Sequence, residues 1–393
     1  MNTWLLPDGI NESLPDDAEK LEALRRQLVD LYATWGYRLV MPPMVEYLES
    51  LRAGMGTQLD LQTFKITDQL NGRMMGIRAD ITPQVARMDA HRLSRGVNKA
   101  AINRLCYIGT VLRTRSAQQG GSRSPVQVGA ELFGHAGIES DFEILSLMLA
   151  TFHSIDVDNV VLDLGHVGVV SGLAEHVGLS QEQRQVYVDM LDRKSIPEIA
   201  EWVTANDFSE DDSKMLRELP LLAGTSDVIK TAQNTLKGAG KVVLDALKHL
   251  QTISDLIHQK YPDLQLHIDL AEMRGYAYHT GIMYTAYLPG KGESIAHGGR
   301  YDGIGEAFGN HRPAIGFSTD LRTLASLIVN YTINKTNILA PNETDKILDA
   351  LIQDLRAKGE TVIRQLDDKS TPQQDGCNRI IQKQGNEWVL VAL

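Results

Sequence analysis

The sequence predicts an α+β protein in which an antiparallel sheet is flanked by helices. Two strand-like runs, 102–112 and 126–133, are rich in apolar and β-forming residues and are separated by a polar loop. Strand patterns return at Leu264 and continue to Phe317. Between these two blocks, about 173–260 shows helical patterns with charged clusters and short turns. These observations indicate one large core that is interrupted by a helical insertion.

The composition is that of an ordinary globular chain. Of 393 residues, 43% are hydrophobic and 23% are charged, and no apolar run approaches the roughly 20 residues of a membrane span. A formal net charge of −11 means that the overall basic character of many nucleic-acid binders is missing. Cys106 and Cys377 fit no metal or redox spacing, and the N-terminus lacks a secretion signal. We expect a reduced, cytoplasmic protein without a metal.

The first 100 residues mix one helix with short strands. Leu21, Leu24, Leu28 and Leu31 recur at helical spacing after a Pro-Asp-Asp start, which predicts an amphipathic helix that ends near Gly36. A short strand is expected at 37–41, before two prolines that force a turn or an edge. The runs 64–67 and 74–77 predict a hairpin with Asn71-Gly72 in its turn, and a helix containing Val85, Met88 and Leu93 follows.

The middle and the end of the chain continue this pattern. A helix is predicted from Asp141, with Phe142, Leu145, Leu149 and Phe152 on one face. Val160–Leu164 predicts a buried strand that the glycines of 165–172 break, and turns are expected at Pro197 and at 220–224. Leu321, Leu324 and Leu327 predict the start of one more helix. We expect a core domain over 1–330 and a short α/β segment over 331–393, the latter with one helix and strands at 362–366, 379–383 and 388–393.

The stretch 271–303 is the first candidate for a binding site. It combines Arg274 with Tyr276, Tyr278, Tyr284 and Tyr287, whose flat rings suit a small planar ligand, and with a glycine-rich run at 298–303 that lets backbone approach it. A half-buried tyrosine-rich hairpin without a ligand is the alternative. His279, His297 and His311 lack a metal-ligand spacing, so we expect ordinary hydrogen-bonded histidines.

A second candidate lies on the two strands before it. Arg113, Arg115 and Arg123 in the loop between these strands are suited to a carboxylate or phosphate, or form a solvated hairpin tip. Gln127 and Glu131 are four residues apart on one strand and therefore point to the same face. An amide and a carboxylate together suit an ammonium group or an imidazole N–H, although the pair is also compatible with a plain surface.

Several motifs resemble histidyl-tRNA synthetase, a class II aminoacyl-tRNA synthetase. The segments 37–46, 107–134 and 313–321 resemble its motifs 1, 2 and 3, in that order. RGYAYHTG at 274–281 and GGRYDG at 298–303 resemble its two histidine-specific motifs. The resemblance runs from about residue 5 to 327 and implies the class II synthetase-like fold, an antiparallel sheet flanked by helices.

Carried over position by position, the resemblance implies a histidine-binding pocket. Gln127 would lie near the α-amino group, Glu131 near the imidazole, and Arg113 and Arg274 near the carboxylate, while His279 stands where the family has a tyrosine. The implied histidine-binding residues are Asp80, Thr82, Arg113, Gln127, Glu131, Arg274, Tyr278 and His279. The set offers cations, anions, an amide and rings to a zwitterion that carries an imidazole.

The chain departs from the synthetase where ATP would bind. Arg115, Gly121, Ala277 and Thr323 stand where the family has a glutamate, an arginine, an aspartate and the ATP-clamping arginine of motif 3. Loss of preorganised charges in such a site costs several kcal/mol of transition-state stabilisation. The tail is also shorter than the anticodon-binding domain of about 90 residues that the synthetase carries.

These departures, with a retained histidine pocket, resemble the regulatory subunit of ATP phosphoribosyltransferase. That resemblance implies no catalytic residues, no cofactor, no tRNA and no membrane. It implies a dimer through the motif 1 region and a hetero-octamer-like complex with the short-form catalytic subunit, which the chain would activate and through which histidine would exert feedback inhibition. The alternatives are an active histidyl-tRNA synthetase, a ligase that adenylates another small acid, and a scaffold with a vestigial pocket.

Overall fold

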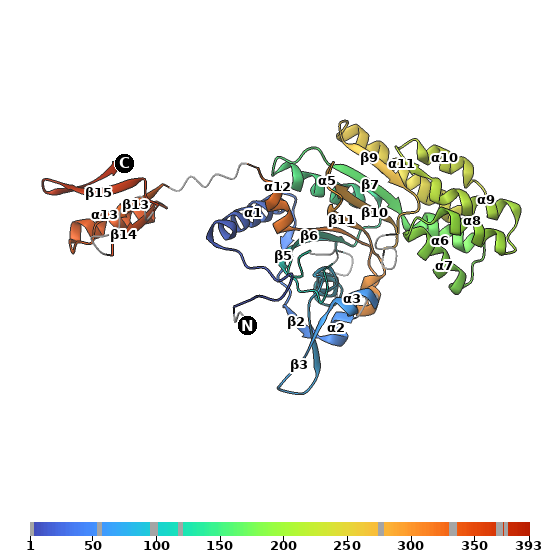
Figure 1. Ribbon diagram of the computed structural model, residues 1–393, viewed down its shortest axis with the longest axis horizontal. Helices are drawn as coiled ribbons and strands as arrows, with labels where there is room; N and C mark the ends of the chain where they lie inside the picture. Colours follow the sequence, from blue (N-terminus) through green and yellow to red (C-terminus); the bar gives the residue numbers. More distant parts are fainter. Residues whose placement is uncertain are drawn as a thin grey trace. The chain divides into compact units, whose positions relative to one another are not determined.

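The computed structural model describes residues 4–52, 57–94, 101–116, 121–273, 279–329, 336–366, 372 and 376–393. The chain divides into two compact units, Met1–Val329 and Asn330–Leu393 (Figure 1). Among the helices that are described, none is long and apolar enough to cross a membrane.

A nine-stranded sheet organises the described part of the larger unit. The strands are, in spatial order, β1 (Arg38–Leu39), β5 (Asn103–Thr110), β6 (Val126–Phe133), β12 (Ala314–Asp320), β11 (Ser294–Arg300), β10 (Ile282–Tyr287), β7 (Val161–His166), β9 (Gln265–Asp269) and β8 (Ala223–Gly224). Within the run β5-β6-β12-β11-β10-β7, each strand pairs antiparallel with the next, as the sequence predicted. At the two ends of this run the pairing is parallel, between β1 and β5 and between β7 and β9.

One face of this sheet is covered by helices and forms the main core. These helices are α1 (Pro15–Thr34), α5 (Ile138–His153), α11 (Lys241–Lys260) and α12 (Leu321–Leu327). The predicted periodicity of α1 is confirmed, because Leu24 and Leu28 are buried and the ring of Tyr32 packs edge-on against Phe317, with centroids 6.2 Å apart. Since side chains alternate along a strand, every second residue of the central strands points away from this core.

A small three-stranded sheet precedes the central strands. It consists of β2 (Val45–Tyr47), β4 (Met74–Ile77) and β3 (Phe64–Thr67), and the predicted hairpin is confirmed, with Gly72 at φ +73° in its turn. Around it lie α2 (Leu48–Arg52), α3 (Thr57–Gln62), α4 (Thr82–Met88) and the π-helix η1 (Asp89–Leu93). The start of α4 carries the segment from Asp80 to Thr82 to the central sheet.

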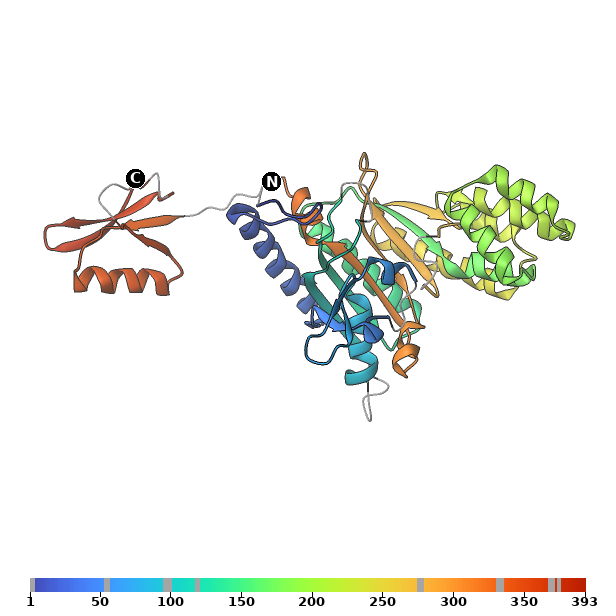
Figure 2. The same cartoon turned by 60° about the horizontal axis from the view of Figure 1, so that its bottom comes forward.

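The insertion is helical, as expected, but it begins earlier than predicted. It contains α6 (Val167–His176), α7 (Gln181–Asp192), α8 (Ile196–Ala205), α9 (Glu210–Glu218), η3 (Leu219–Leu221) and α10 (Val228–Thr235), and the views show them gathered beyond β7 (Figure 2). The expected end of the strand within 165–172 is confirmed, but a helix follows the strand directly. Strand β7 runs to His166, whose imidazole accepts the N–H of Gly168 at 3.0 Å and caps α6.

The expected turn at Pro197 is wrong. This proline lies in the first turn of α8, where its missing N–H has no helical partner to lose. The turn at 220–224 contains η3 and then strand β8, which pairs with β9.

The smaller unit has a four-stranded sheet with one helix. Its elements are β13 (Asn337–Ala340), α13 (Lys346–Ala357), β14 (Thr361–Arg364), β15 (Arg379–Gln384) and β16 (Glu387–Ala392), and the strands are ordered β14-β13-β15-β16. Asp345 caps α13 by accepting the N–H of Ile347 at 2.8 Å and also accepts the indole N–H of Trp388 at 3.0 Å. Strand β13 was not predicted from the sequence. The polar run 330–337, at the end of which β13 begins, was interpreted as a linker.

Candidate functional site

Gln127 and Glu131 lie on the face of the nine-stranded sheet opposite the main core. Along β6, Val128 and Ala130 are buried in the core, so Gln127, Gly129 and Glu131 point to the other side. We call this side the site face. The prediction that Gln127 and Glu131 share a face is confirmed.

Glycines on the site face leave bare backbone beside Glu131. In the strand register, Glu131 is opposite Gly316 of β12, and Gly316 is opposite Gly299 of β11. A Cβ at Gly316 would overlap the Glu131 carboxylate, and one at Gly299 would lie 2.8 Å from Nε2 of His279. Neighbouring strands are about 4.8 Å apart. We call Gly316 and Gly299 the glycine floor. Glu131 lies over Gly316 and His279 over Gly299, so two side chains that are 148 positions apart in the chain lie over adjacent strands.

The Glu131 carboxyl group is held by three hydroxyl groups. It is 1% exposed, and Oε1 accepts hydrogen bonds at 3.0 Å from both Thr82 Oγ1 and Tyr107 OH. The hydroxyl of Tyr301 donates to Oε2. Burial raises the pKa of Glu131 to about 8, against the opposing effect of these three hydrogen bonds. Burial thus favours the neutral form of this acid, and a basic ligand group that approaches it can take up its proton.

Asp80 and Gln127 form a second polar group next to it. The amide Nε2 of Gln127 donates to Asp80 Oδ1 at 2.7 Å, and its Oε1 accepts the N–H of Ile81 at 2.9 Å. The N–H of Thr82 also donates to Asp80 Oδ1, at 2.9 Å. These contacts fix the orientation of the amide and leave a carboxylate beside Glu131. Four of the predicted site residues, Asp80, Thr82, Gln127 and Glu131, are therefore linked by hydrogen bonds.

Two of the three arginines in the loop before β6 have defined partners. Arg113 donates through Nε to the carbonyl of Ala79 at 3.3 Å, which places it next to Asp80. Arg123 donates to the carbonyls of Arg113 and Asp8, both at 3.1 Å. Arg123 thus fixes the loop, and Arg113 is the arginine of the two that borders the predicted site.

The predicted aromatic wall is described only in part. Arg274 and Tyr278 of the predicted set lie outside the described residues, as does Tyr276. His279 is 8% exposed and lies above Gly299. The expectation for Tyr284 is wrong: it alternates to the core side of β10, is 2% exposed, and donates its hydroxyl to the carbonyl of Gly316 at 2.7 Å.

The position that resembles the ATP-clamping arginine supplies a hydroxyl group. Thr323 donates through Oγ1 to Asp320 Oδ2 at 3.1 Å, so it helps to cap α12. The neighbouring Arg322 donates to Ser13 Oγ at 2.6 Å and is held by the N-terminal segment. Position 323 therefore contributes no cation to the site face.

Two family models cover nearly the whole chain. A model described as Histidyl-tRNA synthetase matches residues 9–324, and one described as ATP phosphoribosyltransferase subunit HisZ C-terminal domain matches residues 335–391. An ATP phosphoribosyltransferase regulatory subunit from Thioalkalivibrio sulfidiphilus is 49% identical over 395 residues, covering 100% of this chain and 99% of that protein. The chain belongs to the ATP phosphoribosyltransferase regulatory subunit family.

Further relatives agree with this family. An ATP phosphoribosyltransferase regulatory subunit from Alkalilimnicola ehrlichii is 48% identical, with 99% of this chain and 97% of that protein covered. A solved structure of an ATP phosphoribosyltransferase regulatory subunit/histidyl-tRNA synthetase from Bacillus halodurans matches with a TM-score of 0.82 at 26% identity, covering 94% and 95% of the two chains. The class II synthetase-like fold is confirmed, and the chain is a regulatory subunit rather than a catalytic one.

Sequence reasoning missed two residues of the regulatory subunit's site. Tyr107 lies opposite Gly129 on the site face, and a Cβ at Gly129 would overlap its hydroxyl. Tyr301 follows β11 within the GGRYDG motif. The pairing of strand 102–112 with strand 126–133 was a signal for Tyr107, whereas the contact of Tyr301 with Glu131 spans 170 residues and has no local signal.

The buried acid predicts a pH-dependent stability. The folded state holds the Glu131 proton more tightly than the unfolded chain, where the ordinary pKa is 4.5. The stabilisation from this group is therefore complete below pH 4.5 and is lost as the pH rises through about 8. Relative to Glu131→Gln, we expect the wild-type free energy of unfolding to fall across this range by up to about 1.4 kcal/mol per pH unit. Urea unfolding of both proteins at several pH values measures it; parallel curves would contradict the burial of a neutral acid.

Proposed function

We propose that this regulatory subunit binds histidine on the site face and passes feedback inhibition to the catalytic chain of ATP phosphoribosyltransferase. The observation that carries the proposal is the Glu131 carboxyl group, buried among three hydroxyl donors beside a carboxylate and an amide. A buried acid of this kind, with no Lys or Arg among its hydrogen-bond partners in the described residues, suits the N–H of an imidazole.

The remaining groups suit the amino-acid end of histidine. Asp80 and Gln127 offer an oxygen acceptor for an α-ammonium group, and Arg113 and Arg274 offer cations for the carboxylate. Tyr278 and His279 complete the proposed pocket, with His279 above the glycine floor. Adenylation fits less well, because Thr323 caps α12 where a synthetase needs a cation.

The partner proposed is the short-form catalytic subunit, which this chain activates within a hetero-octamer-like complex in the cytoplasm. Two copies of the chain would meet through the motif 1 region. Met41 and Met44 of that region are 77% and 41% exposed, which supports a contact there. Histidine inhibits if it binds one state of the complex more tightly than another, and its differential affinity sets the extent of inhibition.

Phosphoribosyl transfer to ATP by the catalytic subunit tests this function. We expect the rate to rise when this chain is added and to fall again as histidine is titrated in. With Glu131→Ala in place of the wild type, activation should persist while the histidine midpoint moves to higher concentration. A control with Glu139→Ala, an exposed glutamate on α5, should behave as the wild type does.

Two results would contradict the proposal. One is an unchanged rate on addition of the chain over a range of molar ratios. The other is formation of histidyl-adenylate by the chain alone with ATP and histidine, which would restore the synthetase alternative.

A further inference from the structure

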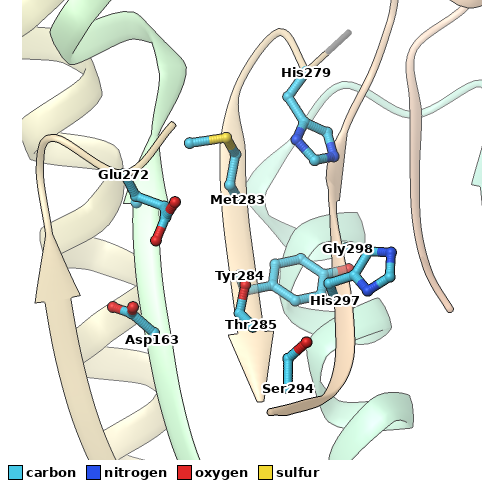
Figure 3. Close-up of a pocket in the computed structure, with 10 residues that line it drawn as sticks. Asp163, Glu272, His279, Met283, Tyr284, Thr285, Ser294, His297 and Gly298 are labelled. Carbon is cyan, nitrogen blue, oxygen red and sulfur yellow. The ribbon is translucent and has the colours of Figure 1, made fainter. Parts of the chain in front are cut away.

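A pocket separate from the Glu131 carboxyl group opens on the same face of the sheet. It has a volume of about 230 Å³ and lies over β7, β10 and β11 (Figure 3). The polar side chains that line it are Asp163, Glu272, His279, Thr285, Ser294 and His297. His279 alone belongs also to the proposed histidine site. The pocket is thus an additional cavity beside that site, nearer to the helical insertion.

The two long walls of the pocket differ in chemistry. Figure 3 shows the carboxylates of Asp163 and Glu272 on one side and the rings of His279 and His297 on the other. Asp163 Oδ1 accepts a hydrogen bond from Nδ1 of His267 at 3.0 Å, and the Asp163 side chain is 15% exposed. Burial raises the pKa of Asp163, and the charges of Asp269 and Glu272 raise it further while His267 lowers it. Glu272 Oε1 accepts the N–H of Met273 at 2.9 Å, and the carboxylates of Asp163 and Glu272 both border the pocket.

The floor of the pocket carries a hydroxyl group that makes no hydrogen bond to any described residue. Thr285 on β10 is 6% exposed and stands between Asp163 of β7 and His297 of β11 in the strand register. Alternation along β10 puts it on the site face, beside Met283 in the pocket lining. The Thr285 oxygen is not one of the fully buried atoms that lack a partner, so it is open to the pocket and can accept a hydrogen bond from a group that enters there.

We propose that the pocket binds a small cationic ligand that carries an ammonium or guanidinium group. The cation would donate hydrogen bonds to Asp163 and Glu272 and to the hydroxyl oxygen of Thr285. The volume is below the roughly 300 Å³ at which pockets for drug-sized ligands begin, so it suits a ligand of amino-acid size.

Other ligand classes fit these walls less well. Phosphates and carboxylates are disfavoured, because the described residues of the lining include two carboxylates and neither Lys nor Arg. A metal ion is not supported by the described side chains, among which no group of three or more His, Cys, Asp or Glu is arranged to hold one. A sugar shares the hydrogen-bond donors of a cation but not its charge, and the experiment separates the two.

Calorimetric titration of the full chain with agmatine tests the proposal. Agmatine carries both cationic groups on a short chain. Asp163→Asn removes the charge without changing the size of the side chain, and we expect it to weaken agmatine binding by at least about tenfold. Thr285→Val removes the hydroxyl from an isosteric side chain and should weaken binding by about threefold. Asp158→Asn, the same change at an exposed position five residues earlier, should leave the affinity unaltered.

Three results would contradict the proposal of a cation-binding pocket. Absence of agmatine binding, equal affinity in the wild type and in Asp163→Asn, or binding of ribose in preference to agmatine would overturn the proposal. Histidine affinity that stays within about threefold in Asp163→Asn shows that the variant is folded and that the two sites differ. If the catalytic subunit displaces agmatine, the natural cation is a side chain of that partner; if agmatine remains bound, it is a free metabolite.

Discussion

Substitution of Glu131 by alanine is expected to lower the affinity for histidine by at least about 30-fold. Loss of one partner from a buried, hydrogen-bonded charge pair costs roughly 2–5 kcal/mol of binding free energy. Glu131 is 1% exposed, and its two oxygens are the meeting point of Thr82, Tyr107 and Tyr301. Without the carboxyl group, the imidazole would face hydroxyl groups that have lost their common acceptor. Isothermal titration calorimetry of the full chain measures the change.

The control for this prediction is Glu139→Ala on α5. The Glu139 side chain is 78% exposed, so its removal should change neither the affinity nor the fold. The thermal midpoint of Glu131→Ala shows whether the variant is folded. A folded Glu131→Ala protein with wild-type affinity would place histidine elsewhere, on this chain or on the catalytic partner.

Removal of Asp141 is expected to destabilise the larger unit by about 3–5 kcal/mol, because it leaves the charge of Arg300 buried and without its main partner. Arg300 is 5% exposed, and its Nε donates to Asp141 Oδ1 at 3.0 Å. The guanidinium also contacts Ser140 Oγ at 2.9 Å and the carbonyl of His135 at 3.2 Å, which are uncharged. Asp302 is a second carboxylate partner at 3.2 Å, but it is more exposed than Asp141 and receives a single hydrogen bond, so it compensates the charge only in part. Urea unfolding of Asp141→Ala against the wild type measures the loss.

Asp158→Ala is the matched control for Asp141→Ala. Asp158 also pairs with a basic side chain, His153, at 2.7 Å, but both partners are more than two thirds exposed. Such a surface pair contributes about 0–1 kcal/mol. If Asp141→Ala shifted the unfolding midpoint no more than Asp158→Ala does, the buried network around Arg300 would have no structural role.

The sequence allowed prediction of the features that depend on local periodicity. Alternation along one strand was enough to put Gln127 and Glu131 on a common face, and leucine spacing was enough for α1. The motif resemblance placed Asp80 and Thr82 beside them, which no local rule would have done. Arg274 and Tyr278 stay predictions.

The errors arose where one residue type serves opposite structural purposes. The glycines of 165–172 were interpreted only as the end of a strand, and β7 does end there. The helix that follows was missed: Gly172 lies within α6, where a Cβ would stand 2.9 Å from Val242 and 3.0 Å from Val243 of α11. Its function is close helix packing. Tyr284 was placed in a ligand wall because its ring suits one, yet strand parity turns it into the core. Composition alone does not distinguish these cases.

The pocket over β7, β10 and β11 could not be predicted, because the residues that line it come from separate strands. Asp163 and Thr285 are neighbours only through the pairing of β7 with β10, across the whole helical insertion. Their register depends on the fold, so the position of the Thr285 hydroxyl in the pocket becomes known only with that register.

The glycine floor limits how this site can change. A surface made of main chain has no side chain to exchange, and the only possible substitution at Gly316 or Gly299 adds atoms that collide with Glu131 or His279. Ligand preference must then be set from the rim, by residues that come from several distant segments of the chain. The base of the site can persist unaltered through a change of function, while the groups around it are replaced one at a time.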